Sequence, residues 1–470
     1  MYQIDFNHPS SIYFVGIGGI SMSGLAEILA DAGFQVSGSD QRKSPLTEKL
    51  IQKGITVHYG QRYENITEAI DCVVFTSAVH ADNPEYQATV DKEIPFLSRA
   101  QLLGQLMKNY KTPIAISGTH GKTTTTSMVS EVLLKADTDP TLSIGGILKT
   151  IGGNIRVGHT DLFVTEACEY TNSFLSFFPK IGIILNIEED HLDFFKDLAD
   201  IRSSFRRFAQ LIPEDGCLII NGEIPDYDEI TAGLSCRVIT YSTSATTSIG
   251  EKADYYADQL TYDEQGHPLF TLYMEKADGL HSHPNQMHLA VPGLHNVSNA
   301  LAALALADSL QLDLTVAAEA LRTFHGTDRR FEYKGTIGGV TIVDDYAHHP
   351  TEITATLTAA ANFPHKRLWC VFQPHTYTRT KAFLQDFAKA LSGAENVILA
   401  DIYAARETDT LGISSRTLQS EIQALGKECY YFPTFDEIEN FLLENCINGD
   451  LLITMGAGDV HKIGENLLGN

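Results

Sequence analysis

Residues 113–134 read PIAISGTHGKTTTTSMVSEVLL, and this stretch decides the fold of the middle of the chain. The apolar run 113–117 predicts a buried strand, GTHGKT (118–123) a sharp turn, and the remainder a helix through Leu134. A glycine turn between a strand and a helix predicts a phosphate-binding loop, because backbone N–H groups and the helix N-terminus can cradle phosphate oxygens. In such a loop the lysine reaches the β- and γ-phosphates of ATP, and the next hydroxyl contacts Mg²⁺.

The loop departs from the strict P-loop pattern at one position. That pattern has a glycine where this chain has Ile116, so the sequence is a shortened variant, G-x-x-G-K-T. The alternative is a glycine turn with an incidental lysine. The strand before the loop and the helix after it favour phosphate binding.

A second glycine turn, GIGGIS (16–21), lies near the N-terminus. It stands between the apolar run Ile12–Ile17 and the amphipathic stretch Ser21–Ala32, and a second strand-like run ends at Asp40. This βαβ pattern resembles a dinucleotide-binding fingerprint, in which an acid near Asp40 holds a ribose. Alone it suggests NAD, but the separate ATP loop downstream favours the diphosphate or ribose of another nucleotide. A tight turn that binds no ligand is the alternative.

The order of strand-like and helix-like runs predicts three α/β domains in series, each with a mostly parallel sheet. We expect a Rossmann-like domain at 1–107, a central ATP-binding domain at 108–323 and a Rossmann-like domain at 324–470. The central part includes a small β-rich segment, 242–288, in which short alternating runs replace the longer apolar ones.

Composition excludes several classes of protein. The formal charge is −25, which argues against a nucleic-acid partner because phosphate backbones need a cationic surface. Seven scattered cysteines without CxxC spacing fit neither a disulfide framework nor a zinc knuckle. We find no signal peptide and no apolar stretch long enough to insert in a membrane, so we expect a soluble cytoplasmic protein.

Eight separated segments together resemble one family. They are GIGGISMSG (16–24), GTHGKTTTT (118–126), EACEYTNSF (166–174), NIEEDHLD (186–193), HNVSNALAA (295–303), DRRFE (328–332), DDYAHHPTE (344–352) and FQPHTYTRT (372–380). This set is similar to the Mur ligases, and the matches span residues 12 to 380. The resemblance implies an ATP-dependent ligase that uses Mg²⁺, with two ions expected.

Within the family, the segments are most similar to the branch that joins L-alanine to the carboxylate of UDP-N-acetylmuramate through an acyl phosphate. The recycling branch, which joins an intact tripeptide to UDP-N-acetylmuramate, is the nearest alternative. A non-catalytic nucleotide-binding regulator and a nicotinamide-dependent oxidoreductase are more distant ones. The oligomeric state stays open.

The resemblance also implies site residues. For ATP these are Gly118, Thr119, His120, Gly121, Lys122, Thr123, Thr124, Asn296, Asn299, Arg330 and Asp345. For Mg²⁺ they are Thr123, Glu166 and His191, and for catalysis Lys122, Glu166, His191 and Arg330. For the UDP-sugar they are Gly16, Gly18, Gly19, Ser21, Asp40 and Ser77, and for the amino acid Tyr346, His348, His375 and Arg379.

For some of these residues, the sequence around them also supports the assigned role or offers an alternative one. Glu166 follows the apolar run Leu162–Thr165, so we expect it at the carboxyl end of a strand, where ligands bind in α/β sheets. An asparagine such as Asn296 can pair with the edge of adenine, but it can also cap the helix that follows. Thr376 stands where many family members have an arginine. Either the amino acid's carboxylate has one cationic contact fewer, or a different residue supplies that contact.

Overall fold

The computed structural model describes residues 2–76, 78–405 and 407–469. The chain divides into two compact units. The first comprises Met1–Ser242, Thr246–Tyr255 and Ala302–Ala317, and the second comprises Thr243–Ala245, Tyr256–Leu301 and Ala318–Asn470.

The first unit begins with a five-stranded parallel sheet of order β3-β2-β1-β4-β5. Its strands are β1 (Ser11–Val15), β2 (Gln35–Asp40), β3 (Thr56–Tyr59), β4 (Cys72–Phe75) and β5 (Phe96–Ser98). Its helices are α1 (Ile20–Asp31), α2 (Pro45–Gln52), α3 (Pro84–Asp91) and α4 (Arg99–Met107), with a short 3₁₀ turn η1 (Tyr63–Asn65). Strands β1 and β4 are almost wholly buried, as expected of a parallel sheet covered on both faces.

A second, mostly parallel set of strands follows in the same unit, in the order β12-β11-β10-β6-β9-β7-β8. The strands are β6 (Thr112–Ser117), β7 (Thr141–Leu148), β8 (Gly153–Arg156), β9 (Leu162–Ala167), β10 (Ile181–Ile184), β11 (Cys217–Asn221) and β12 (Arg237–Ser242). Between them lie α5 (Lys122–Lys135), η2 (Lys149–Ile151), η3 (Tyr170–Ser176), α6 (Leu198–Ala209) and α7 (Tyr227–Thr231). Only β7 and β8 pair antiparallel among these neighbours.

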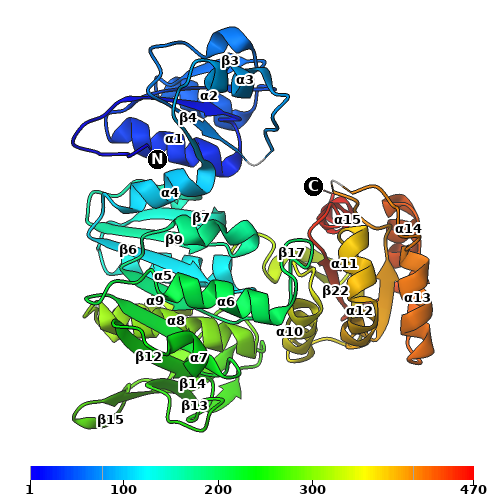
Figure 1. Cartoon of the computed structure of the whole chain (residues 1–470). Helices are drawn as coiled ribbons and strands as arrows, with labels where there is room; N and C mark the ends of the chain where they lie inside the picture. The colour runs from blue at the N-terminus through cyan, green and yellow to red at the C-terminus, as the bar shows by residue number, and fades with distance from the viewer. Residues whose placement is uncertain (1, 77, 406, 470) are drawn as a thin grey trace. The chain divides into compact units, whose positions relative to one another are not determined.

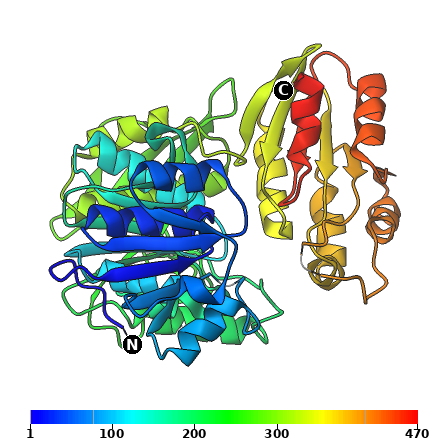
Figure 2. The ribbon, with the colours of Figure 1, turned by 90° about the horizontal axis from the view of Figure 1, so that it is seen from above.

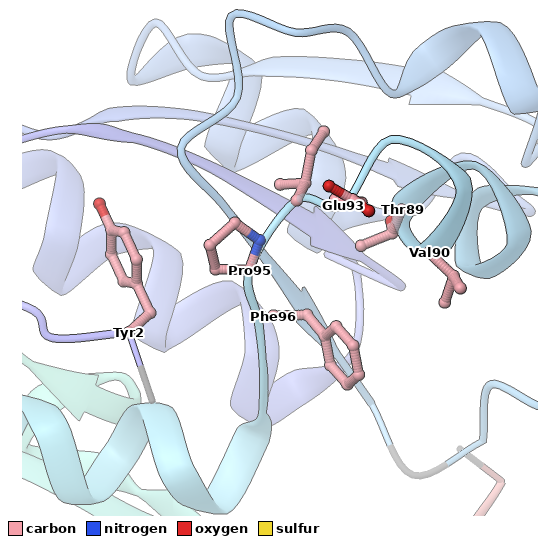
Figure 3. A pocket seen from close by; sticks show the side chains of 7 residues that line it. Tyr2, Thr89, Val90, Glu93, Pro95 and Phe96 are labelled. Atoms are coloured by element: carbon pink, nitrogen blue, oxygen red, sulfur yellow. The ribbon is translucent and has the colours of Figure 1, made fainter.

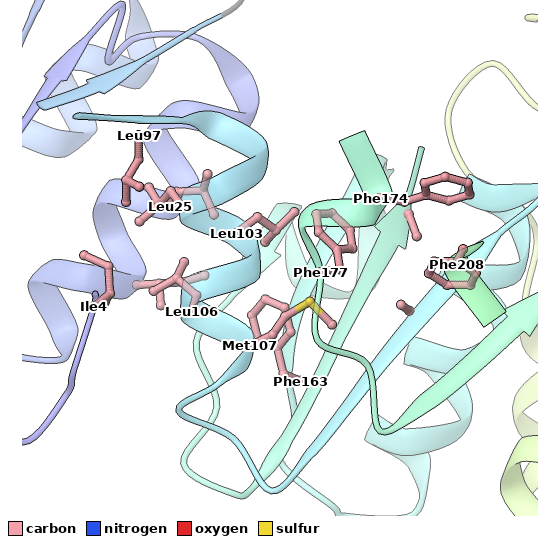
Figure 4. Close-up of a cluster of buried hydrophobic side chains, with 14 of the residues drawn as sticks. Ile4, Leu25, Leu97, Leu103, Leu106, Met107, Phe163, Phe174, Phe177 and Phe208 are labelled. Atoms are coloured by element: carbon pink, nitrogen blue, oxygen red, sulfur yellow. The ribbon is translucent and has the colours of Figure 1, made fainter. Parts of the chain in front are cut away.

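Helix α4 joins the two sheets of the first unit through one continuous hydrophobic core. Figure 1 shows α4 between the blue N-terminal sheet and the cyan strands. In Figure 4, Leu103 and Met107 of α4 point toward Phe163 and Phe177, whereas Leu25 lies toward the N-terminal sheet. The two α/β layers of this unit therefore share buried side chains instead of meeting as separate surfaces.

The second unit contains a small β-rich part and a six-stranded sheet. The former comprises β13 (Tyr255–Tyr262), β14 (Pro268–Lys276), β15 (Gly279–Ser282) and β16 (Met287–His288). The latter has the order β17-β18-β22-β19-β20-β21, and all its neighbours are parallel except β17 and β18. Its strands are β17 (Glu332–Ile337), β18 (Val340–Asp345), β19 (Leu368–Phe372), β20 (Asn396–Leu399), β21 (Glu428–Tyr431) and β22 (Leu451–Met455).

Helices cover both faces of the six-stranded sheet (Figure 2). Alternate residues of one strand enter different cores: Cys370 lies in the core with α10 (Pro350–Ala361) and α12 (Leu384–Leu391). Its neighbour Trp369 lies in the opposite core, with α14 (Phe435–Asn445) and α15 (His461–Leu468). Helices α11 (Tyr377–Ala382) and α13 (Ser415–Ala424) also belong to the second unit. Helices α8 (Leu294–Ser309) and α9 (Leu314–Thr323) are divided between the two units, because residues 302–317 belong to the first.

The predicted fold class is confirmed, including the β-rich segment. The sequence of residues 381–391 predicts one helix, whereas the structure has two, α11 (Tyr377–Ala382) and α12, which are separated by Phe383. Asp345 is the last residue of strand β18 and therefore lies at its carboxyl end. Asn296 is the third residue of α8 and therefore not its cap. Among the described residues, no helix is long and apolar enough to span a bilayer.

Candidate functional site

The phosphate loop predicted at residues 118–123 connects β6 to α5. Gly121 has φ +81° and is the residue just before α5, a conformation that suits glycine. A methyl group on Gly118 would lie 2.9 Å from Cβ of Leu185, so the loop also needs a glycine for space. The loop is tied to the segment after β10, because His120 N–H donates to Oδ1 of Asn186 at 2.8 Å and the Asn186 amide donates back to His120 O at 3.1 Å.

Lys122 is held inside this loop by one ion pair and two carbonyl groups. Its Nζ lies 3.0 Å from Oε2 of Glu169 and also donates to the carbonyl oxygens of Gly118 and Thr119. Burial lowers the pKa of Lys122, but the Glu169 carboxylate outweighs burial and keeps the pKa above its ordinary value. The lysine is therefore a fixed cation at the mouth of the loop.

Glu169 is a residue that sequence reasoning missed, although it lies within the quoted segment EACEYTNSF. Its side chain is only 2% exposed, and its Oε1 lies 3.7 Å from Nε2 of His191. His191 has a left-handed backbone (φ +53°), and its ring lies 4.5 Å from that of Tyr170. The structure thus brings the predicted residues Lys122 and His191 to the same buried carboxylate.

Glu166 and Thr123 meet strand β7 at two glycines, which the sequence alone did not reveal. Gly145 N–H donates to Oε1 of Glu166 at 2.6 Å, and a methyl group on Gly145 would lie 2.5 Å from Oε2. A methyl group on Gly146 would lie 3.0 Å from Cγ2 of Thr123. A carboxylate and a hydroxyl at one bulged strand are oxygen ligands of the kind that Mg²⁺ prefers.

The N-terminal glycine turn is built as predicted, with Asp40 as part of it. Gly16 has φ +82°, and Gly18 N–H donates to Oδ2 of Asp40 at 2.8 Å. Ser21, at the start of α1, accepts from Nη1 of Arg99 at 3.1 Å, so a cation that the sequence did not single out joins the turn. Gly19 is the N-cap of α1, and Ser77 lies outside the described residues.

The second unit has its own group of predicted residues around Glu352. Oε1 of Glu352 lies 3.8 Å from Nη1 of Arg330, and Oε2 lies 3.3 Å from Nδ1 of His348. The Arg330 guanidinium lies 5.3 Å from the centre of the Tyr346 ring, within the range of a cation–π contact. Glu352, whose side chain is 13% exposed, is thus a second largely buried carboxylate that sequence reasoning missed.

Asp345 is buried beside this group. Oδ2 accepts from Phe331 N–H at 2.8 Å and Oδ1 accepts from Ala347 N–H at 2.7 Å. Burial raises the pKa of Asp345 to about 6, although Arg330 and the two N–H groups oppose the shift.

His375 and Arg379 lie close together after β19. Nη1 of Arg379 is 3.4 Å from Nδ1 of His375, whose ring lies 5.8 Å from that of His348. Thr376 has φ +63°, and its hydroxyl accepts from Arg379 N–H at 3.4 Å as the cap of α11. Thr376 thus orients the helix that carries Arg379.

Asn296 and Asn299 are both buried in the first turns of α8. The Asn296 amide donates to Pro292 O at 2.7 Å and accepts at Oδ1 from the Asn299 amide at 3.1 Å. The two amides therefore hold each other in one orientation.

A separate pocket of about 600 Å³ lies at the outer edge of the N-terminal sheet (Figure 3). It is lined by Tyr2, Thr89, Val90, Glu93, Ile94, Pro95 and Phe96, none of which is a predicted site residue.

Comparison with known families agrees with this arrangement. The profile described as "Mur ligase family, catalytic domain" matches residues 11–111, "Mur ligase middle domain" matches 116–307, and "Mur ligase, glutamate ligase domain" matches 329–458. The chain therefore belongs to the Mur ligase family, with three α/β domains in series.

Individual relatives resemble the chain over its whole length. Proteins named UDP-N-acetylmuramate–L-alanine ligase from Lachnospira eligens and Agathobacter rectalis are 57% and 58% identical, and both matches cover 100% of each chain. The crystal structure of the UDP-N-acetylmuramate–alanine ligase of Thermotoga maritima is 30% identical, with a TM-score of 0.77, covering 98% of this chain and 99% of that one. A murein peptide ligase from Psychrobacter arcticus is 25% identical, with a TM-score of 0.68 and 98% coverage of both chains.

The contact between Gly145 and Glu166 can be tested by adding a methyl group. We expect Gly145→Ala to displace the Glu166 carboxylate and to weaken Mn²⁺ binding in the presence of ADP by about 10- to 100-fold, the usual cost of disturbing the support of a metal ligand. Gly153→Ala on β8 is the matched control, because its methyl group meets nothing within 4 Å. Electron paramagnetic resonance would measure free Mn²⁺, and equal binding by both variants would contradict the assignment.

The raised pKa of Asp345 predicts a pH-dependent stability. Between the ordinary value of 3.8 and about 6, the folded chain keeps a proton that the unfolded chain has lost. The free energy of unfolding therefore falls with rising pH across this window, and this contribution levels off above it. Asp345→Asn lacks this titration, so we expect its stability relative to wild type to improve with pH up to about 6. Urea unfolding across this range measures the difference, and a pH-independent difference would refute the prediction.

Proposed function

We propose that the chain joins L-alanine to the carboxylate of UDP-N-acetylmuramate, with ATP as co-substrate and ADP and phosphate as products. The full-length likeness to two relatives of this name carries the choice of substrates. The phosphate loop with its fixed Lys122 supports the ATP-dependent chemistry independently of those names.

The reaction needs activation, because a free carboxylate is a poor acyl donor. A carboxylate oxygen of UDP-N-acetylmuramate attacks the γ-phosphorus of ATP, and the bond to the β-phosphate oxygen breaks to release ADP. The amine of L-alanine then attacks the acyl phosphate and loses a proton. The tetrahedral intermediate expels inorganic phosphate and leaves the amide. Both steps depend mainly on positioning and on electrostatic stabilisation of phosphate charge.

In the first unit, we assign ATP phosphates to the loop 118–124, with Lys122 on the β- and γ-phosphates. Gly16, Gly18, Gly19, Ser21, Asp40 and Ser77 would hold the UDP-sugar. Arg99 adds a positive charge to that turn through its contact with Ser21, which suits a diphosphate.

We further propose that Thr123, Glu166 and His191 hold Mg²⁺, with two ions between them. When bound, the ions would offset the repulsion between a carboxylate and a triphosphate. Two observations support this assignment. Gly145 N–H holds the Glu166 carboxylate in place, and the His191 ring lies against the ring of Tyr170. Glu169 keeps Lys122 and His191 oriented toward the same space.

In the second unit, Arg330 would contact the γ-phosphate, Asp345 the ribose or a metal-bound water, and Asn296 and Asn299 the adenine edge. Tyr346, His348, His375 and Arg379 would bind L-alanine. Arg379 suits the carboxylate because a guanidinium can donate two parallel hydrogen bonds. Thr376 has no charge, so Arg379 would bind the carboxylate of L-alanine without help from an arginine at position 376.

The expected domain boundaries, 1–107, 108–323 and 324–470, remain part of this proposal, as does a cytoplasmic location. ATP as co-substrate and cysteines that are free throughout the described chain both suit the cytoplasm.

The decisive experiment measures phosphate release from ATP, Mg²⁺ and UDP-N-acetylmuramate with L-alanine, with the wall tripeptide and with no acceptor. We expect turnover with L-alanine alone and its loss in Lys122→Ala, with circular dichroism to confirm folding. Turnover only with the tripeptide would move the chain to the recycling branch. Failure with both acceptors would refute the substrate assignment.

Glu169 gives a second prediction for the same reaction. Glu169→Gln keeps the side-chain shape but removes the charge that holds Lys122. We expect kcat to fall by about 100-fold, as when a catalytic group is slightly misplaced. The Kd for ADP should change little, because phosphate oxygens replace the carboxylate as partners of the lysine. Loss of kcat and ADP binding together would indicate a merely structural role, which isothermal titration calorimetry can distinguish.

A further inference from the structure

Two histidines and one aspartate converge in the β-rich part of the second unit. Asp263 and His267 belong to the turn between β13 and β14, and His288 is the last residue of β16. Strand β16 pairs with the start of β14, with His288 opposite Leu269. The pairing therefore places His288 beside the turn. None of these residues takes part in the site described above.

The turn holds the Asp263 carboxylate in a fixed orientation. Oδ1 accepts hydrogen bonds from the N–H groups of Gln265 and His267, at 2.8 and 2.9 Å. Gly266, at φ +79°, allows its own N–H to bond to Asp263 O at 3.0 Å. One carboxylate oxygen is thus used to fold the turn, and the other faces the histidines.

The remaining oxygen, Oδ2, lies 3.3 Å from Nδ1 of His267 and 3.1 Å from Nε2 of His288. All three ligand atoms lie within 4.8 Å of one another. Ligands about 2.0–2.2 Å from a tetrahedral zinc ion are separated from one another by roughly 3.3–3.6 Å. The separations of 3.3 and 3.1 Å from Oδ2 to the two imidazole nitrogens are close to this spacing, so small side-chain movements would admit an ion.

Exposure and charge also suit a cation. The side chains of His267, Asp263 and His288 are 21%, 27% and 37% exposed, so an ion can reach them and water can complete its coordination. Partial burial opposes the charge on Asp263, but the backbone N–H groups of His267 and Gln265 keep its pKa below the ordinary value. The carboxylate is therefore charged at neutral pH.

We propose that Asp263, His267 and His288 form a binding site for a divalent cation of the zinc class. Two imidazoles and one carboxylate select such an ion over Mg²⁺ and Ca²⁺, which prefer oxygen ligands throughout. A bound ion would clamp the β13–β14 turn to β16. This site is independent of the proposed ligase activity.

Calorimetric titration of chelator-treated full-length protein with Zn²⁺ tests the proposal. The titration includes Mg²⁺ and ADP, so that the proposed catalytic metal site is occupied. We expect wild type to bind one equivalent of Zn²⁺ at this site. In His288→Asn the affinity of the site should fall at least tenfold, so that the titration shows one equivalent fewer. X-ray absorption of the zinc-loaded protein should show two imidazole ligands at roughly 2.0–2.1 Å.

His281→Asn is the matched control, since His281 also lies in the β-rich part and contacts an acid, Asp278, at 2.8 Å, but lies outside the three-residue cluster. It should bind Zn²⁺ like wild type. Both variants should keep the circular dichroism spectrum and phosphate release of wild type, because neither residue belongs to the catalytic machinery. Equal Zn²⁺ binding by wild type and His288→Asn would overturn the proposal.

Discussion

The parallel pairing of β9, β6 and β10 is the constraint on which the site in the first unit depends. Ser117 at the end of β6 is level with Ala167 on β9 and with Ile184 on β10. Parallel strands that end in register bring their following loops to one edge of the sheet. The phosphate loop, Glu166 with Glu169, and His191 come from three distant segments, and this register brings them to the same edge of the sheet.

In each unit a cation of the site lies beside a carboxylate, which is 2% exposed in the first unit and 13% exposed in the second. Lys122 is paired with Glu169 in the first unit, and Arg330 lies beside Glu352 in the second. A buried cation without a partner is costly, whereas a paired one can be kept in place and offered to an anionic ligand. The arrangement lets a chain of net charge −25 present local positive charge where phosphate would bind.

Residues missed by sequence reasoning share a physical cause. Glu169 and Glu352 lie inside quoted segments, but their contacts with Lys122 and Arg330 join residues that are far apart in the sequence. Arg99 likewise contacts Ser21, 78 positions away. Gly145 matters because β7 passes close to Glu166, whereas a single glycine in a strand-like run can equally mark a bulge or a bend.

The sequence by itself determined those features that depend on residues close to one another along the chain. The apolar runs, the glycine turns and their spacing predicted three α/β domains and a phosphate loop, because burial periodicity and backbone conformation are local properties. The combination of eight segments indicated the family. Strand order and register could not be predicted from the sequence, since they are set by packing between residues that are far apart along the chain. Only the tertiary structure decided three contacts, because each requires two segments to meet in space. They are the pairing of Lys122 with Glu169, the packing of Gly145 on Glu166 and the approach of His288 to Asp263.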